Sequence, residues 1–233
     1  TTKARLGDEP LQPAWLRLKA RADQALTRAP YTVVDKTMTP ASGDKHDYMS
    51  MGPYWWPDPS QPDGLPYLRR DGRFNPERGG SGFDVTDLEN MSQDVQALAL
   101  AHYFTGDRRY ADKAAEMVRV WFLVPATRMN PNFNHGQAVP GRVSGRAEGV
   151  IDAHRLARVV ESIGLLEPTG ALTADEQAAL RTWFGDLVEW MATSPIGQEE
   201  RAADNNHGLY YDALITHFAL FAGLDDVAQA VAE

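Results

Sequence analysis

The stretch DNNHGLYYD, residues 204–212, places amide, imidazole and phenol groups where a helix is expected to begin. Asp204 or Asn205 can cap that helix, so Asn206 and His207 would lie in its first turn. Backbone amides and the positive end of a helix dipole gather anions at such a place. A histidine there has its protonated form disfavoured and is suited to act as a neutral base. The alternative is a surface histidine without a chemical role.

A second polar stretch, TRMNPNFNHGQAVPGRVSGRAEG at residues 127–149, lies between proline and glycine breakers. It concentrates amide and cationic donors, namely Arg128, Asn130, Asn132, Asn134, His135, Gln137, Arg142 and Arg146. Such donors suit hydroxyls and carboxylates, although asparagines also serve turn geometry alone. Arg146 stands at an expected helix start, where the macrodipole favours acids, and this placement favours a role toward an anion.

A third stretch is rich in aromatic rings and shows neither a helical nor a strand period. Residues 42–64, SGDKHDYMSMGPYWWPDPSQPDG, carry Tyr48, Tyr54, Trp55 and Trp56. Exposed rings of this kind can stack on the apolar faces of sugars, while nearby polar groups bind the hydroxyls. For Trp55 and Trp56 taken singly, covering a core is an equally good interpretation. For the loop as a whole, ligand binding is favoured.

Composition limits the classes of function. With 233 residues, 43% of them hydrophobic and 24% charged, the chain is typical of a globular protein. A net charge of −9 argues against nucleic acid as a partner, and no apolar run is long enough to predict a membrane span. The absence of cysteine excludes disulfides, thiolate metal sites and a cysteine nucleophile. The histidines are scattered, and no His-Glu-x-x-His pair offers zinc-ligand spacing.

Helices are expected over most of the chain. Capping-box sequences at Thr86 and Thr173 each begin one of them. The expected helices cover residues 11–29, 86–104, 107–122, 146–163 and 173–191, with another from about residue 205. The segment 30–84 is rich in proline and glycine, and we interpret it as a lid or binding loop because long irregular segments inside domains are usually functional.

A repeat supports this helical organisation. HYFTGDRRYADKAAE (102–116) aligns without a gap with ALFAGLDDVAQAVAE (219–233), so that Gly106 meets Gly223 and Glu116 meets Glu233. Any two helical hairpins could look alike, but recurring hairpins predict an all-α fold. We expect an incomplete (α/α) toroid in a single domain over residues 1–233. The second copy ends without a C-cap, so we expect the chain to be part of a longer protein.

Several strings in the chain also look familiar. SGDKHDYMSMGPYWWPDP with GLPYLRRDGRFNPE, then TRMNPNFNHGQAVPG with GRAEGVIDAHR, and finally NNHG followed by YYD resemble the alginate lyase family of polysaccharide lyases. The match runs in order from about residue 42 to residue 212. The resemblance implies an incomplete α/α toroid and cofactor-free β-elimination on a uronic-acid polymer. The expected partner is an anionic polysaccharide, alginate rich in mannuronate.

The resemblance also implies roles for individual residues. Asn206 and His207 would bind and neutralise the C5 carboxylate, a Tyr or His would remove the C5 proton, and a Tyr would protonate O4. The expected substrate contacts are Tyr48, Tyr54, Trp55, Trp56, Arg128, Asn134, His135, Gln137, Arg146 and Tyr211. The Arg and Tyr that follow the Asn-His pair in the family are not found in this chain.

Three alternatives stay open at this point. A glucuronan lyase would use the same chemistry, and a non-catalytic polyuronate-binding protein could use the same scaffold. A glycoside hydrolase is the third alternative, since helical toroids also host hydrolases. It would need a pair of carboxylates instead. We expect a monomer in the periplasm or outside the cell, a location that follows from the substrate class.

Overall fold

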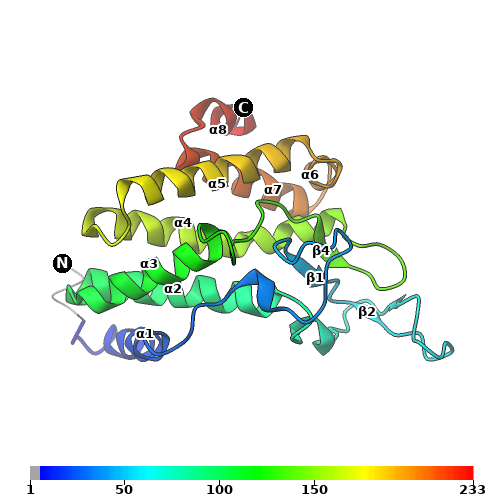
Figure 1. Cartoon of the computed structure of the whole chain (residues 1–233), viewed down its shortest axis with the longest axis horizontal. Helices are drawn as coiled ribbons and strands as arrows, with labels where there is room; N and C mark the ends of the chain where they lie inside the picture. The colour runs from blue at the N-terminus through cyan, green and yellow to red at the C-terminus, as the bar shows by residue number, and fades with distance from the viewer. Residues whose placement is uncertain (1–5, 233) are drawn as a thin grey trace.

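Hairpins of helices make up most of the protein (Figure 1). The computed structural model describes residues 6–232. The helices are α1 Gln12–Ala25, α2 Val85–Thr105, α3 Arg108–Phe122, α4 His154–Leu166, α5 Ala174–Thr193, α6 Pro195–Arg201, α7 Asn206–Ala222 and α8 Asp225–Ala232. The expected all-α fold is therefore confirmed. Within the described residues, no helix is both long and apolar enough to cross a membrane.

The hairpins form two layers. Helices α2, α4 and α7 contact one another in that order, while α3 packs on α2 and α5 packs on α7. In Figure 1 the axes of α2, α4 and α5 run nearly parallel across the view. Successive hairpins stacked in this way are what an (α/α) toroid requires. The closed part of the toroid stays a prediction.

Amphipathic patterning places the core between these layers. In α3 the buried side chains recur every three or four residues, from Tyr110 to Phe122, so one face of the helix turns inward. The Phe122 ring lies 4.7 Å from the ring of Trp183 and 5.6 Å from that of Phe184, both on α5. Large aromatic surfaces buried in this way contribute much of the hydrophobic stabilisation of a domain.

Two glycines terminate helices as the repeat predicts. Gly106 follows α2 with φ 74° and Gly223 follows α7 with φ 77°, and this left-handed conformation is easily adopted only by glycine. The glycine turn of the repeat is thus confirmed in both copies. The match of Glu116 to Glu233 lies outside the described residues.

The two predicted capping boxes have different outcomes. The box at Thr173 is confirmed, because its hydroxyl accepts from the Glu176 amide at 3.2 Å and the Glu176 carboxylate accepts from the Thr173 amide at 2.8 Å. The box at Thr86 is wrong: α2 already begins at Val85, and the Thr86 hydroxyl donates to the carbonyl of Gly79. Its acidic partner, Glu89, is held by arginines of α4 instead.

The helix predicted over residues 146–163 begins later. Residues Ala147–Ala153 form a 3₁₀ helix, and the α-helix starts only at His154. Within the 3₁₀ segment, Gly149 contacts the backbone of Gly136, a tertiary contact that local periodicity does not show. The short helix α6 was not predicted at all.

The long segment 30–84 is built from short elements. It contains β1 Met49–Met51, β2 Trp55–Trp56 and β3 Leu68–Arg69, with 3₁₀ helices at Val33–Asp35 and Pro76–Gly79. Strand β1 pairs in parallel with β4, His135–Ala138, while β2 and β3 form an antiparallel hairpin at the right of Figure 1. The β1–β4 pair joins the aromatic stretch to the Asn-rich stretch at one end of the helices.

Candidate active site

A cleft of about 260 Å³ lies where the β2–β3 region, β4, the 3₁₀ helix before α4 and the start of α7 meet. Its lining residues are Pro53, Tyr54, Trp55, Arg69, Gln137, Arg146, Glu148, Ile151 and His207. Five of the predicted site residues, drawn from all three polar or aromatic stretches, therefore share one cleft. Pro53 and His207, which are 154 positions apart in the sequence, both contribute to it.

His207 occupies the first turn of α7. The side chain of Asn205 caps this helix by accepting from the His207 amide at 2.8 Å. The His207 Nδ1 lies 2.6 Å from Oε1 of Glu200, a residue of α6 that is only 2% exposed. Burial raises the pKa of Glu200. Because Nδ1 is held by this carboxylate, Nε2 is the ring nitrogen left for a ligand. The neighbouring Asn206 is exposed.

Arg146 and Gln137 form a connected pair beside His207. The Arg146 guanidinium donates from Nη2 to the Gln137 side-chain oxygen at 2.8 Å and from Nε to the Gln137 carbonyl at 3.1 Å. Its Nη1 donates to Glu148 at 2.6 Å. Burial lowers the pKa of Arg146, yet a guanidinium stays charged at neutral pH. The cleft thus holds a partly buried cation that is fixed in position.

The backbone of Gln137 adopts an unusual conformation. Its φ is 47°, in the left-handed region that side chains rarely adopt, and such strain clusters at functional sites. The Gln137 amide donates to the Ser50 hydroxyl at 2.8 Å, and that hydroxyl donates to Asp152 at 2.6 Å. Arg78 completes this buried network by donating to Asp152 at 2.6 Å. The network holds Gln137 in its strained conformation.

Close backbone contact fixes the same part of the cleft. A Cβ added to Gly149 would lie 2.4 Å from the carbonyl carbon and oxygen of Gly136. Only glycine at this position lets the 3₁₀ helix that follows Arg146 lie against β4.

Aromatic side chains also line the cleft. The Trp55 ring lies over Gly52, where an added Cβ would come within 2.6 Å of the indole. The Arg142 guanidinium stands 5.4 Å from the Trp55 ring centroid, within cation–π range. Tyr54 is 38% exposed. Trp56 does not line the cleft, and its indole N–H donates to the carbonyl of Arg73 at 2.8 Å.

Two residues predicted to contact substrate are buried in the core, so these predictions are wrong. Tyr48 is fully buried, its hydroxyl donates to Asp152 at 3.0 Å, and its ring packs on Phe133. Tyr211 is 1% exposed, and its hydroxyl donates to the carbonyl of Met191 at 3.0 Å. In both cases a tyrosine buries its ring and satisfies its hydroxyl internally, so no surface is left for a ligand.

Three further predicted contacts lie outside the cleft. Arg128 is exposed, and the Asn134 side-chain oxygen accepts from the Trp190 indole at 3.0 Å. His135 is 8% exposed, with Nε2 3.7 Å from Asp47. Their contact with a substrate stays a prediction.

Sequence reasoning missed Glu200, Glu148 and Arg69. Glu200 precedes His207 by seven residues but belongs to a separate short helix, so spacing gave no signal. Glu148 follows Arg146 by two residues and was visible only as a local charge. Arg69 reaches the cleft because β3 pairs with β2, with Arg69 opposite Trp55. The sequences of these two short strands do not predict that pairing.

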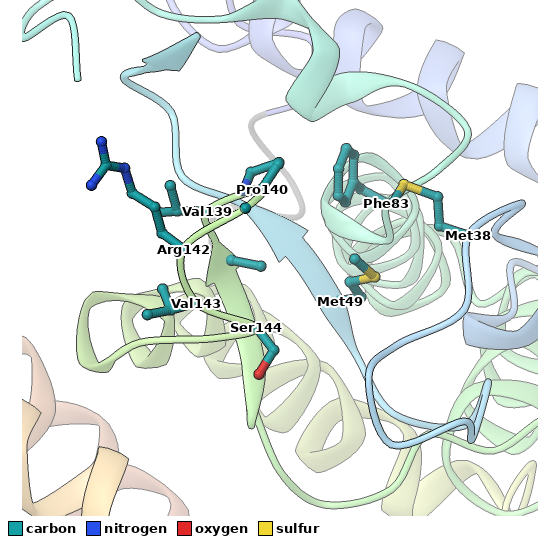
Figure 2. Close-up of a pocket in the computed structure, with 10 residues that line it drawn as sticks. Met38, Met49, Phe83, Val139, Pro140, Arg142, Val143 and Ser144 are labelled. Carbon is teal, nitrogen blue, oxygen red and sulfur yellow. The ribbon is translucent and has the colours of Figure 1, made fainter. Parts of the chain in front are cut away.

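Another hollow, of about 350 Å³, lies beside the loop that follows β4 (Figure 2). Its lining is mostly apolar and includes Met38, Met49 and Phe83. Figure 2 shows the Arg142 side chain pointing away from this hollow, and no carboxylate or imidazole lines it. Acid–base chemistry is therefore confined to the first cleft of these two.

Among residues 6–232, no group of three or more His, Asp or Glu side chains is arranged to hold a metal ion.

Comparisons with known proteins agree with the resemblance seen in the sequence. The model of the alginate lyase family matches residues 32–233. The crystal structure of an alginate lyase from Bacteroides ovatus is similar, with 47% sequence identity and a TM-score of 0.93. That similarity covers 98% of this chain and 60% of the other, so this chain spans about three-fifths of the length of that lyase. No curated protein matches. Since the family model covers most of the sequence, the chain belongs to the alginate lyase family.

Proposed function

We propose that this chain carries the carboxylate-binding part of the active site of a polysaccharide lyase. Its substrate would be a uronic-acid polymer, alginate rich in mannuronate, cleaved by β-elimination. The observation that carries the proposal is that His207, Arg146 and Gln137 line the same cleft as Tyr54 and Trp55. Membership in the alginate lyase family supports the same chemistry.

The first task of such a site is to neutralise the C5 carboxylate of the sugar. Asn206 and His207 at the start of α7 would bind its oxygens, and Arg146 would add a positive charge from the side of β4. Removal of the C5 proton places negative charge on the carboxylate. Donors already fixed around that group stabilise the charge without reorganisation.

The elimination then moves two protons. A tyrosine acting as base takes the C5 proton, and the electrons of that C–H bond form a double bond between C4 and C5. The C4–O4 bond breaks, and its electrons leave with O4, which takes up a proton. Tyr54 lines the cleft and is partly exposed, so its phenol is a candidate for this donor.

Glu200 would act through His207 rather than on the sugar. Its buried carboxylate accepts from Nδ1 and fixes the orientation of the ring, as the acidic partner of a catalytic histidine does in other enzymes. Trp55 would stack on the apolar face of a neighbouring sugar, with Arg142 holding the ring.

The decisive measurement is ultraviolet absorbance over time with polymannuronate, polyguluronate and glucuronan supplied separately. Elimination creates a conjugated C4–C5 double bond, so we expect absorbance to rise on polymannuronate. A rise on glucuronan alone would assign the glucuronan alternative. Saturable oligouronate binding without product would favour a binding protein, and new reducing ends without a double bond would favour a hydrolase.

The variant His207→Ala tests the assignment of the site. We expect it to lower the rate by about 10²–10⁴-fold while the circular dichroism spectrum stays unchanged. The matched control is His217→Ala on the same helix, since His217 faces Glu161 at 3.5 Å and does not line the cleft. Retained activity in His207→Ala would contradict the proposal.

A further inference from the structure

A polar hollow lies between α1, α2 and α4, and none of its lining residues belongs to the cleft. Its volume is about 350 Å³, within the range of small-ligand pockets. Arg17 and Arg21 come from α1, Gln93 and Gln96 from α2, and Arg158 from α4. We call it the arginine hollow. No carboxylate lines it.

The arginines at and behind this hollow outnumber their acidic partners. Asp94 is fully buried and pairs with Arg21 at 2.8 Å and with Arg28 at 2.7 Å. One carboxylate thus serves two guanidinium groups on the side of α1.

The side of α4 repeats this pattern. Glu89 pairs with Arg155 and with Arg158, each at 2.8 Å. Arg155 also reaches Asp152 at 3.3 Å, but that carboxylate is already paired with Arg78.

Arg17 is exposed and makes no ion pair with any described residue. Four arginines, Arg21, Arg28, Arg155 and Arg158, therefore share the carboxylates of Asp94 and Glu89, and Arg17 adds a fifth guanidinium. Three positive charges remain in excess at one place, on a chain whose net charge is −9. Such a local field attracts anions to the hollow.

We propose that the arginine hollow is a second binding site for the uronic-acid oligosaccharide, separate from the cleft. Guanidinium groups suit sugar carboxylates, and glutamine amides suit sugar hydroxyls. Gln93 is directed toward Glu89, whereas Gln96 makes no side-chain hydrogen bond within residues 6–232. Leu18 and Ala97 supply apolar contact for sugar C–H groups. The choice of ligand class rests on the proposed function.

A second site would change how the protein handles long polymers. A polyuronate carries a carboxylate on every sugar, so one chain could engage the hollow and the cleft together if it spans them. The second contact would then be intramolecular, and long chains would bind more tightly than the cleft alone allows.

Nuclear magnetic resonance can observe the two sites separately. The ligand is hexamannuronate, added to the His207→Ala variant so that the ligand is not cut. The side-chain amides of Gln93 and Gln96 report on the hollow, and the indole N–H of Trp55 reports on the cleft. We expect saturable shifts at both places. An unliganded hollow would leave the glutamine signals unchanged while Trp55 shifts, and this would overturn the proposal.

Substitutions in the same background assign the shifts. Arg17→Gln removes an exposed, unpaired charge, so folding should be unaffected, and we expect hexamannuronate to bind the hollow about fivefold more weakly. Trp55 should respond as before. The control Arg109→Gln removes the same charge from the exposed start of α3, and we expect no change at either site.

The remaining outcomes separate this proposal from the proposed function. Equal shifts from acetate at the same carboxylate concentration would overturn a sugar site, because they would show a general anion effect. Shifts of Gln93 and Gln96 without a shift of Trp55 would support the hollow and contradict the proposed cleft. No shift at any of these groups would overturn both.

Discussion

At the scale of single residues, the carboxylate of Glu200 is the group on which His207 depends most directly. It lies 2.6 Å from Nδ1, and burial raises its pKa, so it takes up a proton at a higher pH than an exposed glutamate does. The protonated acid no longer offers a charged acceptor to Nδ1–H. Activity should therefore fall on the acid side as Glu200 becomes protonated.

Glu200→Gln should lower kcat by at least about tenfold and leave KM nearly unchanged, because Glu200 does not touch the sugar. The variant should also lose the part of the acid-side decline that comes from Glu200, since glutamine does not titrate. Rates of double-bond formation across mildly acid to neutral pH measure both effects. Glu199→Gln, an exposed neighbour on α6, is the control. A pH profile unchanged in Glu200→Gln would refute this role.

The close contact at Gly149 leads to a prediction about the free energy of unfolding. In Gly149→Ala the new Cβ would meet the Gly136 carbonyl at 2.4 Å, so backbone must shift, at a cost of about 1–3 kcal/mol. Gly164→Ala is the matched control, because its Cβ would meet nothing within 4 Å. Alanine in the interior of α4 should stabilise that helix by up to about 1 kcal/mol. Urea unfolding curves measure both changes, and equal effects would contradict the contact.

At the scale of elements, the start of α5 depends on Glu176. The carboxylate closes the capping box with Thr173 and binds Arg119 of α3 at 2.5 Å. The hydrogen bonds from Arg119 lower the pKa of Glu176 to about 2. A carboxyl whose folded pKa lies below its unfolded value stabilises the fold above the unfolded pKa. That stability is lost as the pH falls toward 2.

Glu176→Gln should therefore reduce the free energy of unfolding at neutral pH by about 1–2 kcal/mol. This is less than the free energy that corresponds to the whole pKa shift, because the pair of Glu176 and Arg119 is partly exposed to solvent. The gap between variant and parent should narrow as the pH falls. Thermal unfolding at several pH values tests this. Glu189→Gln, exposed on the same helix, should change stability by less than about 0.5 kcal/mol. A gap that does not depend on pH would rule out the linkage.

The helical elements were predictable because their signals are local. The apolar period of α3, the capping box at Thr173 and the glycines after α2 and α7 act within a few residues. The 3₁₀ helix before α4 was not predictable, since Gly149 is positioned by Gly136 of another segment. The Thr86 box failed for a related reason: Glu89 pairs with arginines of α4 rather than with its own helix end.

The residues of the candidate site also fall into a group that the sequence predicted correctly and a group that it did not. His207, Arg146 and Trp55 stood out because their types did not fit the expected local structure, and the cleft brings them together. Tyr48 and Tyr211 look the same in sequence, yet they face the core, and no local pattern tells the two cases apart.

At the scale of the whole molecule, the local charge at the two binding regions is opposite in sign to the net charge of the chain. A chain of net charge −9 repels a polyanion at long range, and salt weakens this repulsion. The cleft and the arginine hollow both collect arginines, so the molecule offers local positive regions on an acidic surface. A polymer would therefore be guided toward these regions once it is close.

The two sides of the cleft differ in how they are built, and amide hydrogen exchange should reveal this. The β4 side is buried throughout, whereas β2 and β3 have two residues each, none of them fully buried. We expect amides of β4 to exchange only on global unfolding and those of the hairpin to exchange through local opening. Bound oligouronate should slow exchange in the hairpin, and uniform rates in both strands would contradict this. Part of the binding free energy would then be spent on ordering one side of the cleft, so the shortest oligomers, which make the fewest contacts, should gain least.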